Sequence, residues 1–138
     1  MNSNEGNAIV FNGSKLPLEK KEFTLNEDIG NDDAIVEITL STVCGSDVHT
    51  WLGHRPFPTP CVLGHEMVGK IIAMGKNLTV DYTGQELQIG DKVVWSMTVG
   101  CGECFFCKKK LPQKCTNMFK YGHEKSDQRP HFTGGFAK

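Results

Sequence analysis

Four of the six cysteines lie close together in one segment, with a spacing that suits a metal ion. The segment reads Cys-Gly-Glu-Cys-Phe-Phe-Cys, followed by seven residues and a fourth cysteine, and its candidate ligands are Cys101, Cys104, Cys107 and Cys115. Four thiolates are the ligand set that a structural Zn²⁺ takes in tetrahedral geometry. Disulfides between cysteines only three residues apart would close strained rings, which favours a metal site over a disulfide framework.

An iron–sulfur cluster is the rival metal interpretation of the same cysteines. Bacterial ferredoxins also use Cys-x-x-Cys-x-x-Cys, but there the next cysteine follows after about three residues and precedes proline. Here Cys115 comes after seven intervening residues. We therefore predict zinc, with unliganded or disulfide-bonded thiols as the remaining alternative. Nearby lysines would offset part of the negative charge of a zinc tetrathiolate, although they also suit a solvated face: Lys108, Lys109, Lys110 and Lys114.

A second group of candidate ligands combines three kinds of side chain. Cys44 opens the sequence Cys-Gly-Ser-Asp-Val-His, and His65 and Glu66 belong to a Gly-His-Glu sequence farther along. Mixed thiolate, imidazole and carboxylate ligation with an open position is the composition of a catalytic zinc site, which keeps room for a water or alcohol oxygen. Taken alone this spacing is a weak signal, because lone buried cysteines and histidines satisfied in the core are common. The ligand interpretation therefore depends on the other motifs.

Four motifs follow one another along the chain. They are Cys-Gly-Ser-Asp-x-His at 44–49, Gly-His-Glu-x-x-Gly at 64–69, Gly-Asp-Lys-Val-Val at 90–94, and the four-cysteine segment. Together they closely resemble the medium-chain, zinc-dependent alcohol dehydrogenases, over roughly residues 20 to 138. The resemblance implies a mainly β, GroES-like catalytic domain over 1–138, built as a partly open β-barrel with short helices and a structural-zinc lobe at about 98–119.

The resemblance also implies roles for the residues of both groups. Cys44 and His65 match the first two ligands of the catalytic zinc, and Glu66 matches a neighbour that ligates the metal in polyol-dehydrogenase-like members. Ser46 matches the hydroxyl that touches the substrate oxygen, and His49 matches the outer member of the proton relay. The four clustered cysteines match the structural zinc lobe. In this chemistry zinc lowers the pKa of the bound alcohol, the serine passes its proton toward the relay histidine, and the alkoxide gives hydride to nicotinamide.

Two parts of such an enzyme are missing from these residues. The resemblance places the third catalytic ligand and a Rossmann domain for NAD or NADP beyond Lys138, and the chain contains no Gly-x-Gly-x-x-Gly sequence. We therefore expect the catalytic domain of a longer, homo-oligomeric enzyme that acts on a small-molecule alcohol or carbonyl compound, with the 138 residues inactive alone. The alternative is a metal-binding GroES-like structural or assembly module without redox activity, which has no need for an open metal site.

Composition and charge argue against several other classes of protein. The chain has 138 residues, 38% of them hydrophobic and 22% charged, which indicates about one globular domain. A formal charge of −1 gives no field that attracts nucleic acid or an anionic membrane. No apolar run approaches about 18 residues, and the first residues are too polar for a signal peptide, so we expect a cytoplasmic protein.

Short strands must position the candidate ligands. Alternating apolar residues predict a half-buried strand at Ala34–Leu40, and similar runs occur at Ala8–Phe11, Met67–Met74 and Lys92–Trp95. One short helix is predicted over 46–53, with the first of these residues, a serine, as its N-cap. Many short strands with little helix favour a sandwich or a barrel.

The sequence also supports predictions for residues outside the motifs. The polar segment 123–129, which begins with His123, is predicted to be an exposed loop. Cys61 is predicted to be a small buried hydrophobe, and the residues from Phe132 to Phe136 to begin a further element. Three more residues either line a substrate cleft or belong to ordinary packing and surface: Trp51, His54 and Phe57.

Overall fold

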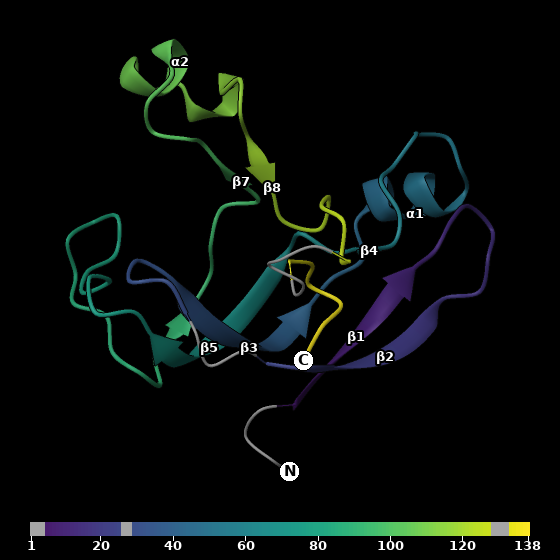
Figure 1. Cartoon of the computed structure of the whole chain (residues 1–138), viewed down its shortest axis with the longest axis horizontal. Coiled ribbons are helices and arrows are strands. Elements are labelled where there is room, and N and C mark those ends of the chain that lie inside the picture. Colours follow the sequence, from purple (N-terminus) through teal and green to yellow (C-terminus); the bar gives the residue numbers. More distant parts are fainter. Residues whose placement is uncertain (1–4, 26–28, 128–132) are drawn as a thin grey trace.

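The computed structural model describes residues 5–25, 29–127 and 133–138, which form a mainly β structure (Figure 1). In chain order the elements are β1 Glu5–Phe11, β2 Glu19–Thr24, β3 Ala34–Ser41, α1 Gly45–Trp51, β4 Cys61–Val62, β5 Met67–Met74, β6 Lys92–Val93, β7 Thr98–Val99, α2 Phe105–Lys108, the 3₁₀ turn η1 Pro112–Lys114, and β8 Phe119–Lys120. Short strands with two short α-helices confirm the predicted mainly β class.

The strands form three sheets. Two have three strands each, in the orders β2-β1-β4 and β3-β5-β6, and the third pairs β7 with β8. Every strand pair among the described residues is antiparallel, unlike the parallel sheet of a Rossmann unit. Figure 1 shows β7, α2 and β8 projecting away from the two larger sheets. We call this projecting segment, residues 98–120, the cysteine lobe.

The buried core lies where β1 meets β4. Two clusters of buried side chains occupy this place: Ala8, Val10 and Val62 in one, and Phe11, Cys61 and Leu63 in the other. Phe136 packs against both clusters, and its carbonyl oxygen accepts a hydrogen bond from the backbone N–H of Ile9 at 2.8 Å. The further element predicted to begin at Phe132–Phe136 is therefore a short segment that forms a β-bridge to β1, between Ala137 and Ala8. Phe132 itself lies outside the described residues. Cys61 is fully buried, and burial raises the pKa of its thiol to about 12, which confirms its packing role.

The strands agree only in part with the sequence-based prediction, and β1 begins at Glu5, three residues before the predicted Ala8–Phe11. β5 has the predicted bounds, and β3 extends the predicted strand by one residue. The strand predicted at 92–95 is only Lys92–Val93. β2 was not predicted, because it reads Glu-Lys-Lys-Glu-Phe-Thr and lacks an apolar face. It is an edge strand that pairs with β1 alone, a place where charged side chains discourage pairing with another chain.

The prediction of an exposed loop at 123–129 holds only in part for the described residues 123–127: Lys125 and Asp127 are exposed, but the other three are not. His123 is half-buried and Ser126 is 5% exposed. The backbone N–H of Ser126 donates to the carbonyl oxygen of Pro60 at 2.7 Å, and Lys125 forms a β-bridge with Cys61. Backbone hydrogen bonds hold this polar segment against the core, and hydropathy alone does not report them.

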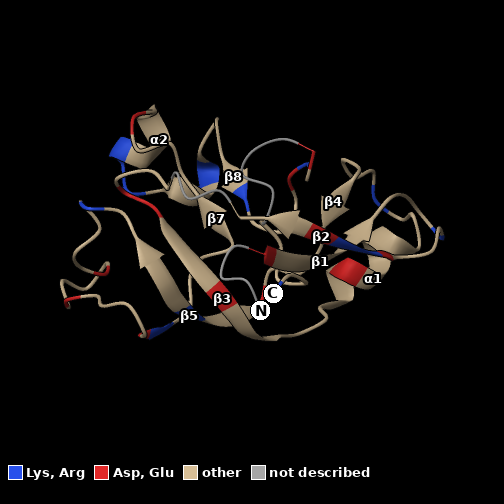
Figure 2. Cartoon of the chain, turned by 60° about the horizontal axis from the view of Figure 1, so that its bottom comes forward, with Lys and Arg blue, Asp and Glu red and all other residues tan. Residues whose placement is uncertain are grey.

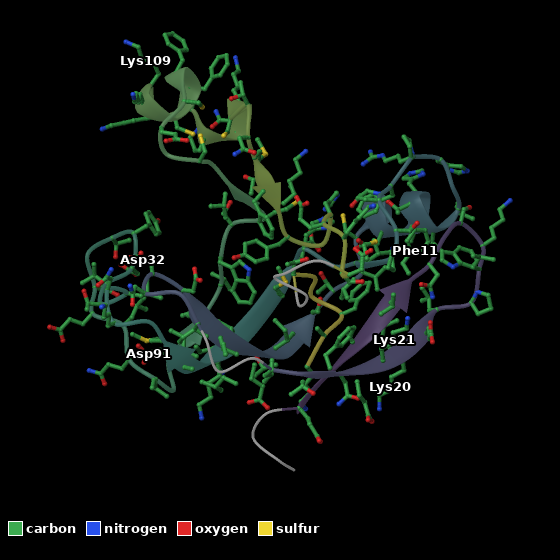
Figure 3. All side chains as sticks on the ribbon, in the orientation of Figure 1. Phe11, Lys20, Lys21, Asp32, Asp91 and Lys109 are labelled. Carbon is green, nitrogen blue, oxygen red and sulfur yellow. The ribbon has the colours of Figure 1, made fainter. Side chains whose placement is uncertain are left out.

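Positive charge gathers on the cysteine lobe. Figure 2 shows lysines in blue on α2 and β8, and Figure 3 shows Lys109 at the outer end of the lobe with sulfur atoms behind it. Phe105, which begins α2, is 70% exposed. None of the helices in the described residues is long and apolar enough to cross a membrane.

Two glycines let the loop at 122–123 approach the loop at 64–65. Gly64 and Gly122 have φ angles of +92° and +74°, in the region that L side chains rarely adopt. A Cβ atom on Gly122 would collide with the carbonyl oxygen of Gly64. The close approach brings the rings of His65 and His123 to a centroid distance of 5.5 Å.

Replacing Gly122 by Ala is expected to lower the free energy of unfolding by about 2 to 4 kcal/mol, because positive-φ strain adds to a backbone clash. Gly84→Ala is the matched control, since Gly84 has a φ of +89° and open space around it. That variant carries only the strain, about 1 to 2 kcal/mol. Denaturant unfolding measures both losses. Equal losses would show that the contact with Gly64 contributes nothing.

Candidate metal centres

The cysteine lobe brings its four sulfur atoms together. The Sγ atoms of Cys101, Cys104, Cys107 and Cys115 all lie within 4.8 Å of one another, and those of Cys104 and Cys115 are 3.9 Å apart. A tetrahedral Zn²⁺ with bonds of about 2.3 Å places its sulfurs about 3.8 Å apart. Every described cysteine is free, which argues against the disulfide alternative. The spacing and chemistry of the donors therefore fit a zinc ion.

Backbone N–H groups of the lobe point at the sulfur atoms. Cys115 Sγ accepts from the backbone N–H of Cys101 at 3.2 Å and from that of Asn117 at 3.3 Å. Hydrogen bonding from the backbone of Cys107 is the main cause that lowers the pKa of Cys104 to about 6, and the bond from Cys101 lowers the pKa of Cys115. Burial raises the pKa of Cys107 to about 12. The backbone of the lobe thus stabilises the ionised form of Cys104 and Cys115, and a bound dication would stabilise the ionised form of all four cysteines.

Apart from the cysteines, few buried side chains stabilise the cysteine lobe. α2 has four residues and η1 has three, and neither contains a buried side chain. Gly100 leaves room for the packing of Cys107, because a Cβ atom there would lie 2.8 Å from the Cys107 sulfur. A segment with so small an apolar core depends on its cysteines for a fixed structure.

The second candidate centre joins residues far apart in the sequence. A ligand atom from each of Cys44, His65 and Glu66 lies within 4.8 Å of the other two. Cys44 is the N-cap of α1, and the other two residues stand between β4 and β5. One thiolate, one imidazole and one carboxylate are a donor set that fits Zn²⁺ with a further position for a substrate oxygen. The structure therefore brings together the three residues predicted for this site.

Asp47 links the two segments and was missed as a site residue. Its carboxylate is 5% exposed and accepts hydrogen bonds from the backbone N–H groups of Cys44, at 2.8 Å, and Gly64, at 3.3 Å. The same oxygen that faces Gly64 lies 3.6 Å from Nδ1 of His65, which has no hydrogen-bond partner among the described residues. A carboxylate behind Nδ1 orients the ring and leaves Nε2 for a metal. The available sequence signal was an acidic residue three positions after the N-cap.

The helix starts earlier than predicted, and the hydrogen bond from the backbone N–H of Cys44 to Asp47 explains why. α1 begins at Gly45 with Cys44 as its N-cap, whereas the sequence indicated Ser46. The reason is that the side chain of Asp47 accepts from the backbone of Cys44, which fixes the first turn two residues earlier than a cap at Ser46 would.

The structure does not connect Ser46 directly to His49. Ser46 Oγ lies 3.4 Å from Nε2 of His65, next to the candidate metal ligand. His49 is exposed, and its Nδ1 lies 3.0 Å from Nδ1 of His54. Among the described residues no hydrogen bond joins the two predicted members of the relay, so their roles stay a prediction. Trp51 and His54 are exposed, whereas Phe57 packs against the core, as the packing and surface interpretation expects.

A cavity lies beside the second centre. It has a volume of about 350 Å³, and its lining includes Thr42, His65, Glu66 and Trp95. The indole Nε1 of Trp95 is buried without a hydrogen-bond partner among the described residues. On another side of His65 the ring of His123 lies against Phe57, at a centroid distance of 4.7 Å. Burial is the main cause that lowers the pKa of His123.

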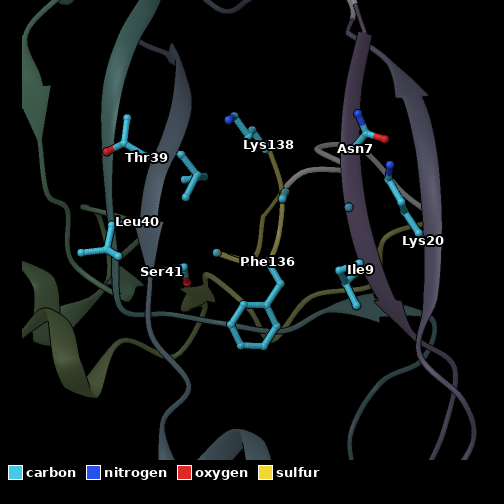
Figure 4. A pocket seen from close by; sticks show the side chains of 12 residues that line it. Asn7, Ile9, Lys20, Thr39, Leu40, Ser41, Phe136 and Lys138 are labelled. Carbon is cyan, nitrogen blue, oxygen red and sulfur yellow. The ribbon is translucent and has the colours of Figure 1, made fainter.

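A larger groove lies away from both centres. It has a volume of about 450 Å³ and runs between β1 and β3, where Figure 4 shows Ile9, Leu40 and Phe136 around it. None of the candidate metal ligands lines this groove. Although this groove is larger than the cavity beside the second centre, it lacks the ligands that the predicted zinc chemistry needs.

Removing metal is expected to loosen the cysteine lobe, including its β7–β8 pair, and to leave the two three-stranded sheets intact, because only the lobe depends on its cysteines for structure. Hydrogen exchange of the backbone amides, measured with and without a zinc chelator, tests this. Exchange should rise across 98–120 and stay unchanged in β1, β3 and β5. Equal loss of protection in those strands, or none in the lobe, would contradict the assignment.

Replacing Asp47 by Ala is expected to lower the free energy of unfolding by about 2 to 4 kcal/mol, because two backbone donors lose their partner. Asp81→Ala is the matched control, since Asp81 also accepts backbone hydrogen bonds, from Thr83 and Gln85, but in an exposed loop. Denaturant unfolding should show a much smaller loss for the control. Similar losses of unfolding free energy in the two variants would mean that the buried hydrogen bonds of Asp47 stabilise the fold no more than the exposed ones of Asp81.

Known proteins are similar to this chain in sequence and in fold. Residues 30–138 match the family model described as the alcohol dehydrogenase GroES-like domain. The chain is similar to the zinc-type alcohol dehydrogenase B of Aspergillus flavus, with 34% identity over 125 residues that cover 90% of this chain and 27% of that protein. It is also similar to the solved structure of an alcohol dehydrogenase from Thermotoga maritima, with a TM-score of 0.85 and 37% identity, covering 96% of this chain and 37% of that one.

A third similar protein was solved with a nicotinamide cofactor. It is a short chain alcohol dehydrogenase from Escherichia coli complexed with NADH, with a TM-score of 0.76 and 27% identity, covering 98% of this chain and 35% of that one. The chain thus spans between 27% and 37% of the length of these three proteins. The predicted GroES-like fold is confirmed, and the chain belongs to the alcohol dehydrogenase GroES-like domain family.

Proposed function

We propose that these residues are the catalytic, zinc-binding domain of an NAD(P)-dependent alcohol dehydrogenase, which oxidises an alcohol to an aldehyde or ketone when full-length. The observation that carries the proposal is the convergence of Cys44, His65 and Glu66 beside a cavity of about 350 Å³. The membership of the chain in the family supports it. The NADH complex of the similar Escherichia coli structure supports the nicotinamide cofactor.

Each residue group has a separate task in this proposal. The four cysteines of the lobe hold a structural Zn²⁺, and Cys44, His65 and Glu66 hold a catalytic one. A catalytic Zn²⁺ supplies Lewis acidity, which lowers the pKa of an alcohol oxygen. Ser46 Oγ would accept the proton of the alcohol and pass on its own hydroxyl proton, and His49, exposed on α1, would release a proton to solvent. Because no hydrogen bond joins Ser46 and His49 among the described residues, this transfer needs a bridging water or hydroxyl group between them. Asp47 keeps His65 oriented through Nδ1.

The positions of the charged and apolar groups suit a small, neutral substrate. Apolar Leu40, Met67 and Val94 line the cavity together with His65 and Glu66. Such a lining takes the carbon chain of an alcohol and leaves its oxygen to the polar side. Hydride transfer also needs a nicotinamide held close to the substrate carbon, and no Gly-x-Gly-x-x-Gly sequence is present to hold it. We therefore expect the 138 residues alone to be inactive.

A GroES-like structural or assembly module without redox activity is the second candidate. Its cysteine lobe would still bind zinc, but a second, exchangeable metal at Cys44 would have no purpose. The two candidates therefore differ in the number of metal ions and in the exposure of one of them to small ligands.

The chain is expected to bind two equivalents of Zn²⁺ or Co²⁺, and Cys44→Ser is expected to remove one of them. The reason is that Cys44 contributes the sole sulfur of the proposed catalytic site, whereas the lobe has four of its own. Metal analysis after gel filtration measures the stoichiometry, and Cys61→Ser serves as a control for a cysteine outside both centres. Loss of both metals in Cys44→Ser would contradict two independent sites. A single equivalent in the unmodified chain would favour the structural module.

A further inference from the structure

Thr42 is tied to Glu66 at two points. Thr42 follows the last residue of β3, and its backbone N–H donates to the carbonyl oxygen of Glu66 at 3.0 Å. Its side-chain Oγ1 donates to Oε2 of Glu66 at 2.5 Å. Both side chains are exposed and line the cavity beside the second centre. The hydroxyl therefore acts on the carboxylate at the edge of the proposed metal site.

The length of this bond indicates a charge-assisted interaction. Hydrogen bonds from a hydroxyl to an ionised carboxylate are about 2.5 to 2.7 Å long and about twice as strong as neutral ones. An exposed glutamate has three rotatable side-chain bonds, and fixing them costs roughly 1 to 2 kcal/mol of entropy. The bond from Thr42 offsets this cost before any metal binds, because it selects one orientation of Glu66.

The hydrogen bond leaves the carboxylate able to bind a cation. A carboxylate has two oxygens and about four lone-pair positions, and Thr42 occupies one position at Oε2. A Glu66 oxygen meanwhile lies within 4.8 Å of the donors of Cys44 and His65. Partners of this kind behind a ligand typically change metal affinity by about 10- to 100-fold.

We propose that Thr42 is a positioning residue that holds Glu66 as a ligand of the metal at Cys44 and His65, the third ligand that these 138 residues supply. The inference rests on the proposed catalytic metal site and adds the residue that orients the Glu66 carboxylate toward the metal. Without the hydroxyl, the exposed carboxylate would turn toward solvent and the site would keep a thiolate and an imidazole alone.

The chain offers a matched control in Thr39. Its Oγ1 also donates across the β3–β5 pair, to the carbonyl oxygen of Val68 at 3.1 Å, but it contacts none of the proposed ligands. Thr39→Val therefore removes a threonine hydrogen bond from the same strand and leaves Glu66 as it is. Thr42→Ser keeps the hydroxyl, and Thr42→Val removes it with little change in shape.

The experiment is a Co²⁺ titration of the whole chain with its lobe already filled by zinc. Affinity is measured by competition with a chelator, and the visible Co²⁺ spectrum reports the ligand number. Thr42→Val is expected to weaken binding by about 10- to 100-fold and to change the visible bands. Thr42→Ser and Thr39→Val should keep the affinity and spectrum of the unmodified chain, and lobe zinc should stay constant in all variants.

A double-mutant cycle makes the role of Glu66 explicit. In a Glu66→Gln background, Thr42→Val should have no further effect beyond about twofold, because the ligand that it positions is gone. Equal affinity and spectra for Thr42→Val and the unmodified chain would overturn the inference and leave the metal site in place. An equal loss in Thr39→Val would overturn it too, since the effect would then be a general loosening of the strand. A chain whose lobe is filled by zinc and that then binds no Co²⁺ would overturn the proposed function together with this inference.

Discussion

A buried carboxylate holds the proposed catalytic centre together. Asp47 accepts hydrogen bonds from the backbone at Cys44 and at Gly64 and lies beside Nδ1 of His65. Two further contacts join these parts of the chain, because Ser46 Oγ lies 3.4 Å from Nε2 of His65 and Thr42 donates to Glu66. Asp47 is the most buried of the residues that make these links, and it contributes to the placement of Cys44 near His65 and hence to any shared metal site.

The two candidate centres depend on the fold in opposite ways. The cysteine lobe draws all four ligands from residues 101–115 and has little apolar packing, so a metal would stabilise its structure directly. The second centre takes its ligands from α1 and from the turn between β4 and β5, which the sheets already hold in place. A preorganised site with few protein ligands is suited to catalysis, because it keeps a position for substrate.

The sequence predicted the features that are local or strongly periodic. β5 and β3 have enough alternating residues to be recognised, and both groups of metal ligands follow motifs with fixed spacing. It missed β2, whose charged residues reflect an edge position, and it misjudged His123, whose burial depends on two loops meeting at Gly64 and Gly122. It also did not predict the links that Asp47 and Thr42 make, since these join residues 17 and 24 positions apart in the sequence that only the fold brings together.

The central claim is that one chain carries two chemically different zinc centres. X-ray absorption at the zinc edge of the fully loaded chain tests it most directly, because it counts sulfur neighbours per metal. A site with four sulfurs and a site with one predict an average of about 2.5 sulfurs per zinc at about 2.3 Å, with nitrogen or oxygen as the remaining neighbours. An average of four sulfurs per zinc, with no nitrogen or oxygen, would contradict the mixed centre and with it the proposed catalytic role.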